Sequence, residues 1–289
     1  GCTSLVSIGD LNNVESIANE AFSNCSALEH VDELDKITSI GQYAFMGCTA
    51  LKSIGSLHNL ETIGQGAFSG CSALEHVDDL YSLTRLESGA FAHCASLVSV
   101  DCSDKLTAIG SSAFFGCKAL VSIGDLSNVT SIESSVFRGC IALKSIGNMP
   151  KLESIGMQCF MGCTALETVG DLSSLKEIPS ETFDGCTSLV SIGDLSNVTI
   201  IGSYGFNQCK KLTSIPNLGS LERVDQFAFS GCESLALLGN LRKLTSFGNS
   251  PFVNSPFHNC PNLVLEVLPD SAAEQYAKNY SMRYTYITE

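Results

Sequence analysis

The sequence predicts a solenoid, a fold in which the chain winds into stacked coils of similar length. Eleven phenylalanines are each followed three positions later by cysteine, and the first ten of these phenylalanines, from Phe22 to Phe229, recur with a constant 23-residue period. Within a unit, apolar side chains recur at every third position, as at Leu120, Ile123 and Leu126. That spacing fits neither the 3.6-residue period of an α-helix nor the two-residue period of a flat strand, so the chain has to keep turning.

Each 23-residue coil is expected to combine short parallel β-strands with turns and loops. A coil that bends around a narrow interior points every third side chain inward, and successive coils stack through very short strands. Glycine follows the second aliphatic residue of many units, where a corner needs backbone freedom. These glycines are Gly9, Gly55, Gly124, Gly147, Gly170 and Gly193. One coil buries too little apolar surface to fold alone, and about twelve coils stacked ~4.8 Å apart would form a rod or arc roughly 55 Å long.

The two ends of the chain depart from the repeat. Residues 1–21 begin inside a unit, because GCTSL at 1–5 matches GCTAL at 47–51. Further repeats, a removed leader or end-to-end packing are therefore expected there. Near the other end, an insertion makes 232–259 an irregular 28-residue unit. It carries two extra apolar residues, Phe252 and Val253, which makes it a candidate binding loop; otherwise it adjusts the last coil to the end of the chain.

The residues after Cys260 are expected to close the rod. Ser271 and Glu274 have the spacing of a capping box, which starts a helix. Four apolar residues then fall at helical spacing on one face, namely Ala273, Tyr276, Ala277 and Tyr280. We therefore divide the chain into a solenoid at 1–260 and a C-terminal cap with a short helix at 261–289.

Twelve of the fourteen cysteines occupy one repeat position. Their Cα atoms would lie ~4.8 Å apart, yet their Cβ vectors would run parallel, which is poor geometry for disulfides. No C-x-x-C pair or companion histidine suggests zinc, so buried free thiols are favoured over bridges or metal. Cys159 takes an alanine position and is predicted to be core. Cys102 falls at an acidic or polar position, where a surface thiol is favoured, and it is the best candidate for a reactive or pairing thiol.

The charge balance argues against nucleic acids and membranes as partners. Thirty acidic residues outnumber sixteen Lys and Arg residues, and the formal net charge is −14. A strongly acidic protein is repelled by phosphate backbones and by anionic membranes. No run approaches the 18 apolar residues of a membrane helix, and the chain lacks the basic and apolar regions of a leader. We expect neither nucleic-acid binding nor membrane insertion by this segment.

Polar residues recur along the repeat instead of converging on one site. His30 and His76 occupy the same repeat position two coils apart, or ~10 Å, which is too far for one metal ion. Serines such as Ser53 and Ser99 also recur at one position. A serine nucleophile would need a base and an oriented acid at one unique place. We therefore predict no catalytic residues, no metal and no cofactor, with a hydrolase as the remote alternative to a non-enzymatic protein.

The motif inside the unit is similar to that of a known family. The segments LKSI at 51–54 and IGQGAFSGC at 63–71 resemble the Bacteroides surface protein A-like (BspA-like) leucine-rich repeat, and the match covers nearly the whole chain. The resemblance implies a leucine-rich-repeat solenoid. It also implies an extracellular or cell-surface protein, often of a host-associated microbe, that binds other proteins or mediates adhesion. It implies no catalytic residues.

The leading hypothesis is a non-enzymatic cell-surface or secreted module for protein binding or adhesion, with a host extracellular or surface protein as one candidate partner. Outward positions vary from coil to coil while inward positions do not, so a contact strip is predicted at outward residues beside the Leu-to-Ile strand. These residues are Glu29, His30, Asp32, Lys52, Glu75, His76, Asp78 and Lys144. The alternative is a passive structural spacer within a larger surface protein.

Overall fold

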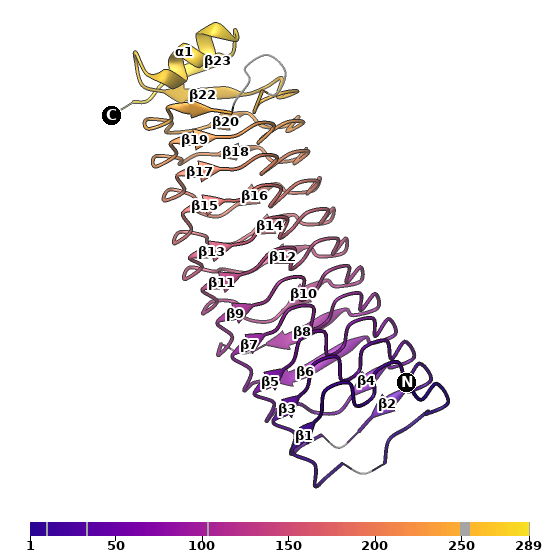
Figure 1. Ribbon diagram of the computed structural model, residues 1–289. Coiled ribbons are helices and arrows are strands. Elements are labelled where there is room, and N and C mark those ends of the chain that lie inside the picture. Colours follow the sequence, from indigo (N-terminus) through magenta and orange to yellow (C-terminus); the bar gives the residue numbers. More distant parts are fainter. Residues whose placement is uncertain (10, 33, 103, 249–254, 289) are drawn as a thin grey trace.

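The protein is an elongated stack of coils, as Figure 1 shows. The computed structural model describes residues 1–288, apart from 10, 33, 103 and 249–254. The chain forms a parallel-strand solenoid of about eleven turns, close to the expected twelve. Among the described residues there is one α-helix, which lies at the C-terminal end. The solenoid predicted from the repeat is therefore confirmed. The candidate loop residues Phe252 and Val253 lie outside the described residues.

Two strands from each coil form two rows along the stack, which we call the odd-strand row and the even-strand row. The odd-strand row contains β1 (Ser16–Ile17), β3 (Ser39–Ile40), β5 (Thr62–Ile63), β7 (Arg85–Leu86), β9 (Ala108–Ile109), β11 (Ser131–Ile132), β13 (Ser154–Ile155), β15 (Glu177–Ile178), β17 (Ile200–Ile201), β19 (Arg223–Val224) and β21 (Ser246–Phe247). The even-strand row contains β2 (His30–Val31), β4 (Ser53–Ile54), β6 (His76–Leu80), β8 (Ser99–Cys102), β10 (Ser122–Ile123), β12 (Ser145–Ile146), β14 (Thr168–Val169), β16 (Ser191–Ile192), β18 (Ser214–Ile215), β20 (Leu237–Leu238), β22 (Val264–Val267) and β23 (Arg283–Tyr286).

Residues one repeat apart lie over one another in both rows. Ser16 pairs with Ser39 and Ile17 with Ile40, and the same parallel register recurs along the stack. In a typical strand the first residue faces solvent and the second, an aliphatic residue such as Ile40, is buried. The strands are this short because the three-residue apolar spacing turns the chain before a longer strand can form.

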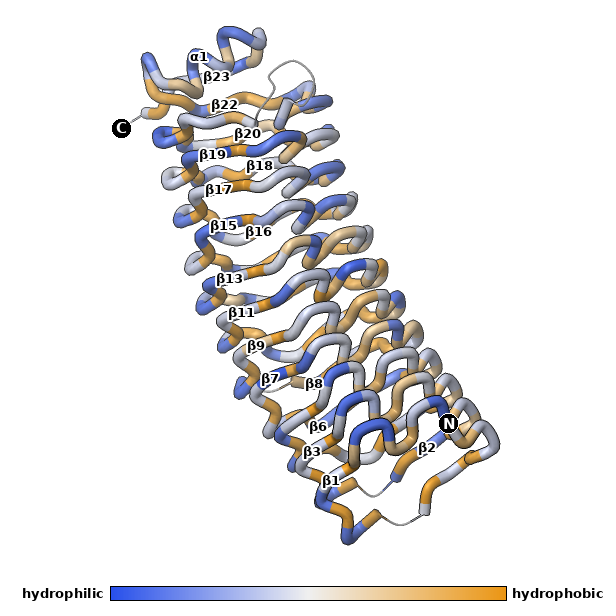
Figure 2. The backbone as a smooth tube through the Cα atoms, viewed as in Figure 1, coloured by the Kyte–Doolittle hydropathy of each residue, from blue (hydrophilic) through white to orange (hydrophobic). Residues whose placement is uncertain are grey.

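A continuous stack of phenylalanine rings runs through the interior. From Phe22 to Phe257, the centroids of neighbouring rings lie 5.1–5.9 Å apart and the ring planes differ by at most 20°. The rings from Phe45 to Phe229 are fully buried. Figure 2 shows apolar residues recurring at the same places in successive coils. Both faces of an internal ring therefore contact rings of neighbouring coils, and such stacked aromatic pairs stabilise the contact between coils.

The cysteines take part in the contact between coils. All fourteen are free thiols, and all but Cys2 and Cys260 are buried, so the prediction of buried free thiols is confirmed for the other ten cysteines of the repeat position. The thiol of Cys71 donates a hydrogen bond to the carbonyl oxygen of Phe45 in the preceding coil at 3.1 Å. The same contact recurs from Cys48 to Cys260. Cysteine suits this position because it is small, apolar and a weak donor.

Cys102 differs from its predicted environment. The pairing of β6 with β8 shifts register between Val77 and Leu80, and Cys102 pairs with Leu80. The shift moves Cys102 from a polar position by residue count into the buried aliphatic column, where it is 5% exposed. Burial, followed by the charge of Asp101, raises the pKa of Cys102 to about 12. The prediction of a surface or reactive thiol at Cys102 is therefore wrong, whereas Cys159 is fully buried as predicted.

Left-handed backbone occurs directly before the cysteine of the repeat. Gly162 and Gly185 adopt φ values of 74° and 75° there, while His93 and Gln208 adopt 62° and 59° in other coils. Glycine reaches this conformation without strain, whereas other residues do not. Some of the glycines predicted at the corners serve a different purpose, which is close approach of neighbouring coils: at Gly124, an added Cβ would lie 2.5 Å from the backbone nitrogen of Cys102.

The C-terminal residues cover the ends of both strand rows. Helix α1 (Ala272–Asn279) begins at Ser271, whose side chain accepts a hydrogen bond from the backbone N–H of Glu274, as the capping box predicts. The ring of Tyr276 on α1 stacks on Phe247 of β21, with 3.9 Å between centroids, and so covers the end of the odd-strand row. The even-strand row ends with β22 and β23, which pair in parallel.

A buried carboxylate ties the helix to the last strand. Glu274 is 2% exposed. It accepts hydrogen bonds from the backbone N–H of Asp270 at 2.8 Å and from the Tyr286 hydroxyl at 2.6 Å, and it pairs with Lys278 at 2.8 Å. The hydrogen bonds from Lys278 and Tyr286 lower the pKa of Glu274 from 4.5 to about 2.

Gly162→Ala is expected to lower the free energy of unfolding by about 1 kcal/mol, because alanine is strained at positive φ. An added Cβ meets no atom within 4 Å at Gly162, so the loss of stability measures the cost of the backbone conformation without a steric clash. Gly147→Ala is the matched control, since its surroundings are equally open and its φ lies outside the left-handed region. Urea unfolding of both variants measures the difference, and equal losses would contradict the prediction.

Acidification is expected to weaken the C-terminal cap. Because the pKa of Glu274 is lower in the folded protein than in the unfolded chain, its stabilising effect is complete above pH 4.5 and disappears as the pH falls toward about 2. The stability advantage of the wild-type protein over Glu274→Gln should therefore shrink between pH ~6.5 and pH ~2.5. Urea unfolding at the two pH values tests this, with Glu233→Gln as an exposed control. If the stability difference between the wild-type protein and Glu274→Gln does not change with pH, the lowered pKa of Glu274 is contradicted.

Candidate functional site

The predicted contact strip lies mainly in the N-terminal part of the even-strand row. His30 begins β2 and His76 begins β6, and β4 lies between these strands. Glu29, Lys52 and Glu75 each precede one of the three strands by one residue. The three coils therefore carry these five side chains at two adjacent outward positions.

The remaining members of the strip are more widely spaced. Asp32 and Asp78 follow the buried valine of β2 and β6, respectively, and both are exposed. Lys144 is also exposed and has the repeat position of Glu75, but it lies three coils further along, or about 15 Å at ~4.8 Å per coil. The structure thus brings seven of the eight predicted residues onto three adjacent coils and places Lys144 apart from them.

Contacts between coils hold several of these side chains in place. Lys52 Nζ lies 2.8 Å from Glu29 Oε2, and this hydrogen bond is the main reason why the pKa of Glu29 is lowered. His30 Nδ1 lies 2.8 Å from the Ser53 hydroxyl, and a second histidine, His76, makes the same contact with the next serine of the repeat at 3.1 Å. The Lys–Glu pair is about half exposed, so it orients charges more than it stabilises the fold.

Two exposed valines, which the sequence analysis did not single out, fill the gap between Glu75 and Lys144. Val98 and Val121 have the same repeat position on the two intervening coils, and each is 37% exposed. Their signal in the sequence is an apolar residue at an outward position that holds Glu or Lys in five other coils, at Glu29, Lys52, Glu75, Lys144 and Glu167. We define the contact column as the six side chains stacked at this position on successive coils: Glu29, Lys52, Glu75, Val98, Val121 and Lys144.

Acidic residues gather beside the contact column near β6 and β8. Asp79 accepts a hydrogen bond from the Ser56 hydroxyl at 2.9 Å and has a φ of 64°. Tyr81 is 48% exposed, and its pKa is raised first by hydrogen bonding to Asp79 and then by the charges of Asp79, Asp101 and Asp78. An aromatic side chain thus lies among three carboxylates.

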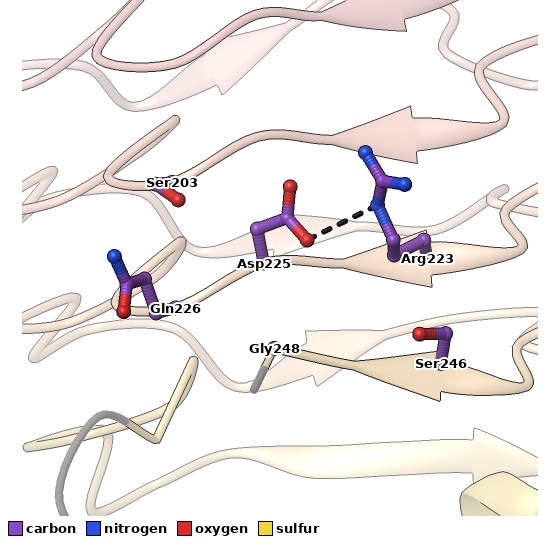
Figure 3. Close-up of a pocket in the computed structure, with 6 residues that line it drawn as sticks. All are labelled: Ser203, Arg223, Asp225, Gln226, Ser246 and Gly248. Atoms are coloured by element: carbon purple, nitrogen blue, oxygen red, sulfur yellow. Dashed lines mark ion pairs between the residues drawn. The ribbon is translucent and has the colours of Figure 1, made fainter. Parts of the chain in front are cut away.

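The odd-strand row carries a polar cavity of about 340 Å³, shown in Figure 3. It is lined by Ser203, Arg223, Asp225, Gln226, Ser246 and Gly248. Arg223 Nε lies 3.1 Å from Asp225 Oδ1. The lining comes from three successive coils, so a polar ligand there would contact more than one repeat.

A more apolar groove of about 420 Å³ follows the turn before the repeat cysteine. Phe115 and Met161 line it, and the ring of His93 meets the ring of Phe115 edge-on with 5.0 Å between centroids. The guanidinium carbon of Arg138 lies 5.7 Å from the Phe115 centroid. This groove lies outside the contact column and outside the odd-strand cavity.

The described residues do not form a metal or thiol centre. They contain no group of three His, Cys, Asp or Glu side chains that could hold a metal ion. Burial raises the pKa of Cys48 and Cys260 to about 11 and that of Cys117 to about 12. These thiols are therefore protonated and weakly nucleophilic at neutral pH. Among the helices in the described part of the chain, none has the length and apolar character needed to cross a membrane.

One protein-family model matches the chain. Its description is BspA type leucine rich repeat region (6 copies), and the matches cover residues 1–97, 73–189 and 153–272. No curated protein matches the chain. The three overlapping matches together include the odd-strand row and the even-strand row as far as β22, and they reach the start of helix α1.

Several solved structures are similar over most of the chain. A leucine-rich cell surface protein from Faecalibacterium prausnitzii has 25% identity and a TM-score of 0.54, over 91% of this chain and 85% of that protein. A leucine-rich repeat protein from Bacteroides ovatus has 26% identity and a TM-score of 0.44, over 98% and 92% of the two chains. One from Eubacterium ventriosum has 20% identity and a TM-score of 0.48, over 88% and 87%.

The native protein is expected to expose one rapidly reacting thiol. Cys2 is exposed, Cys260 is half-buried and the other twelve cysteines are buried. A maleimide added to the folded protein should modify Cys2 quickly and Cys260 slowly, whereas all fourteen should react in guanidinium chloride. Mass spectrometry of timed digests measures each site, and Cys2→Ala should remove the fast phase. Rapid modification of Cys102 in the native state would contradict its burial.

Proposed function

Because the chain belongs to the BspA-type leucine-rich repeat family, we propose that it is a non-enzymatic surface or secreted module that binds a protein partner through the contact column. The observation that carries the proposal is the arrangement of this column, in which exposed Val98 and Val121 lie between Glu75 and Lys144. Protein interfaces commonly combine an apolar centre with a polar rim. The backbone is the same in each coil, whereas the side chains of the column differ from coil to coil. The column therefore presents a pattern that a partner can recognise.

The size of the surface supports a macromolecular partner. Six successive coils at ~4.8 Å each give a column roughly 24 Å long. The outward residues His30, Asp32, His76 and Asp78 widen it toward the next positions of the strands. One side of a standard protein–protein interface covers about 800 Å², so the column would form the centre of such an interface and the neighbouring outward positions its rim. A small molecule would contact only a fraction of it.

The charges favour a partner with basic groups around an apolar residue. Asp78, Asp79 and Asp101 lie beside the column, and the whole chain carries a formal charge of −14. An acidic surface accelerates association with a basic partner, and salt screens the effect. Binding is therefore expected to have an association rate that falls as ionic strength rises.

The family and one similar protein support the proposed location and role. The Faecalibacterium prausnitzii protein, similar over 91% of this chain, is a cell surface protein. We propose that this chain acts outside the cell or at its surface and that its partner is a host extracellular or surface protein, with adhesion as its role.

The two valines provide the test. Val98→Ser combined with Val121→Ser should weaken binding on the order of 10-fold, because two apolar side chains that the partner would bury in the complex are lost. Val190→Ser is the matched control, since Val190 has the same repeat position and is 42% exposed but lies three coils beyond Val121. Surface plasmon resonance against a panel of purified host extracellular and surface proteins measures both the affinity and the salt dependence.

Two outcomes would count against this function. Equal loss of affinity in the double variant and in Val190→Ser would remove the contact column as the binding surface. Binding of no panel protein by the wild-type chain, with all variants folded, would favour the passive spacer.

A further inference from the structure

Two arginines occupy the same repeat position in the odd-strand row, and each is followed two positions later by an acid. Arg85 begins β7 and precedes Glu87, whereas Arg223 begins β19 and precedes Asp225. Arg223 lies six full repeats after Arg85. Both side chains therefore start from equivalent backbone, and differences in their contacts come from the neighbouring coils.

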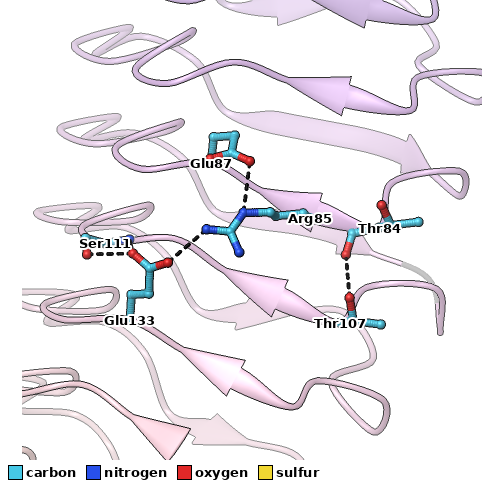
Figure 4. Close-up of polar contacts among 6 residues, drawn as sticks. All are labelled: Thr84, Arg85, Glu87, Thr107, Ser111 and Glu133. Atoms are coloured by element: carbon cyan, nitrogen blue, oxygen red, sulfur yellow. Dashed lines mark hydrogen bonds and ion pairs between the residues drawn. The ribbon is translucent and has the colours of Figure 1, made fainter.

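Arg85 binds two carboxylates, as Figure 4 shows. Its Nε donates to Glu87 Oε1 at 2.9 Å, and its Nη2 donates to Glu133 Oε1 at 2.8 Å. The other oxygen of Glu133 accepts hydrogen bonds from the backbone N–H and the hydroxyl of Ser111, at 3.0 and 2.9 Å. The hydrogen bonds from Arg85 and Ser111 lower the pKa of Glu133. This cluster shows how the repeat binds a carboxylate beside an existing Arg–acid pair.

Small residues on the intervening coil allow Arg85 to reach Glu133. Ala108 and Gly110 have the repeat positions of Arg85 and Glu87 on the next coil, so no long side chain fills the space. An added Cβ at Gly110 would lie 2.7 Å from the backbone nitrogen of Ser88, which excludes larger residues there. Close packing of the coils thus keeps the residue between the arginine and the second carboxylate small.

The coil after Arg223 also carries two small residues. Ser246 and Gly248 replace Arg223 and Asp225 there, and both line the 340 Å³ cavity. Within the described part of the chain, Asp225 is the one acid that forms an ion pair with Arg223. Figure 3 shows that the ion pair uses Nε, while the guanidinium extends toward the preceding coil, which carries Ser203. The hydroxyl of Ser203 lines the same cavity from the coil before Arg223, whereas Ser111 lies on the coil after Arg85.

We propose that the cavity at Arg223 binds one carboxylate group, from an acidic side chain of a protein partner or from a free carboxylic acid. The guanidinium supplies two donors in a planar fork that matches a carboxylate, and the hydroxyls of Ser203 and Ser246 supply further donors. The inference does not rest on the contact column, which lies in the other strand row.

The charge and size of the cavity favour a carboxylate over a phosphate. Asp225 neutralises one charge of the site, so a dianionic phosphate would meet more repulsion than a singly charged group. The Arg85 cluster holds two carboxylates on one arginine, which shows that the neighbouring acid does not prevent binding of a second. A volume of about 340 Å³ accommodates a side chain or a small acid.

Nuclear magnetic resonance of the arginine Nε–Hε groups tests the proposal in the full chain. Acetate and an acetylated, amidated Gly-Glu-Gly peptide should each shift the Arg223 resonance and saturate it at millimolar concentrations, while the Arg85 resonance stays in place. The Gly-Gln-Gly peptide should cause no shift. Saturation by the glutamate peptide at tenfold lower concentration than acetate would assign the site to a partner's side chain, and equal concentrations would assign it to free acids.

A matched pair of variants locates the binding site. Ser203→Ala should raise the acetate concentration for half-saturation several-fold, because one donor is lost. Ser180→Ala, at the same repeat position on the preceding coil but outside the cavity, should leave it unchanged. Three results would overturn the proposal: no shift of Arg223 up to about 50 mM acetate, equal affinities in the two variants, or inorganic phosphate saturating at a lower concentration than either carboxylate.

Discussion

Stacking of identical side chains from coil to coil is the interaction on which the rest of the structure depends. Phenylalanine rings of neighbouring coils contact one another face to face, and each repeat thiol donates to the carbonyl of the phenylalanine in the preceding coil. These contacts keep the coils in register. A shift by one residue would exchange the buried aliphatic residue of each strand for an outward serine, so the register is strongly determined. The stack ends where Tyr276 covers β21 and β23 pairs with β22.

A scaffold held together from inside leaves its outward positions free to differ. The contact column uses one such position to place valines between charged residues, although the backbone beneath them is the same. Arg85 and Arg223 show the same principle in the odd-strand row, where equivalent backbone carries one arginine with two carboxylates and another beside an open cavity. Binding chemistry therefore depends on which side chains neighbouring coils contribute.

The chemistry of the chain is suited to binding. Its most abundant reactive groups, the thiols, are used in packing, and burial raises their pKa. Each histidine of the strip contacts a serine of the next coil. Among the described residues, these histidines are not part of a cluster that could bind a metal ion. Extended surfaces built from several coils are what such a fold offers to a partner.

The sequence by itself determined the repeat, the burial of the phenylalanine, cysteine and aliphatic positions, and the capped helix at Ser271, because each follows from local spacing and a fixed repeat period. It also placed seven residues of the strip on adjacent coils. Tertiary structure alone decided the burial of Cys102, because a register shift between two strands cannot be read from residue counts. It likewise decided the partners of Arg85 and the cavity beside Arg223, because the reach of a long side chain depends on the size of the residues that the next coil places in its path.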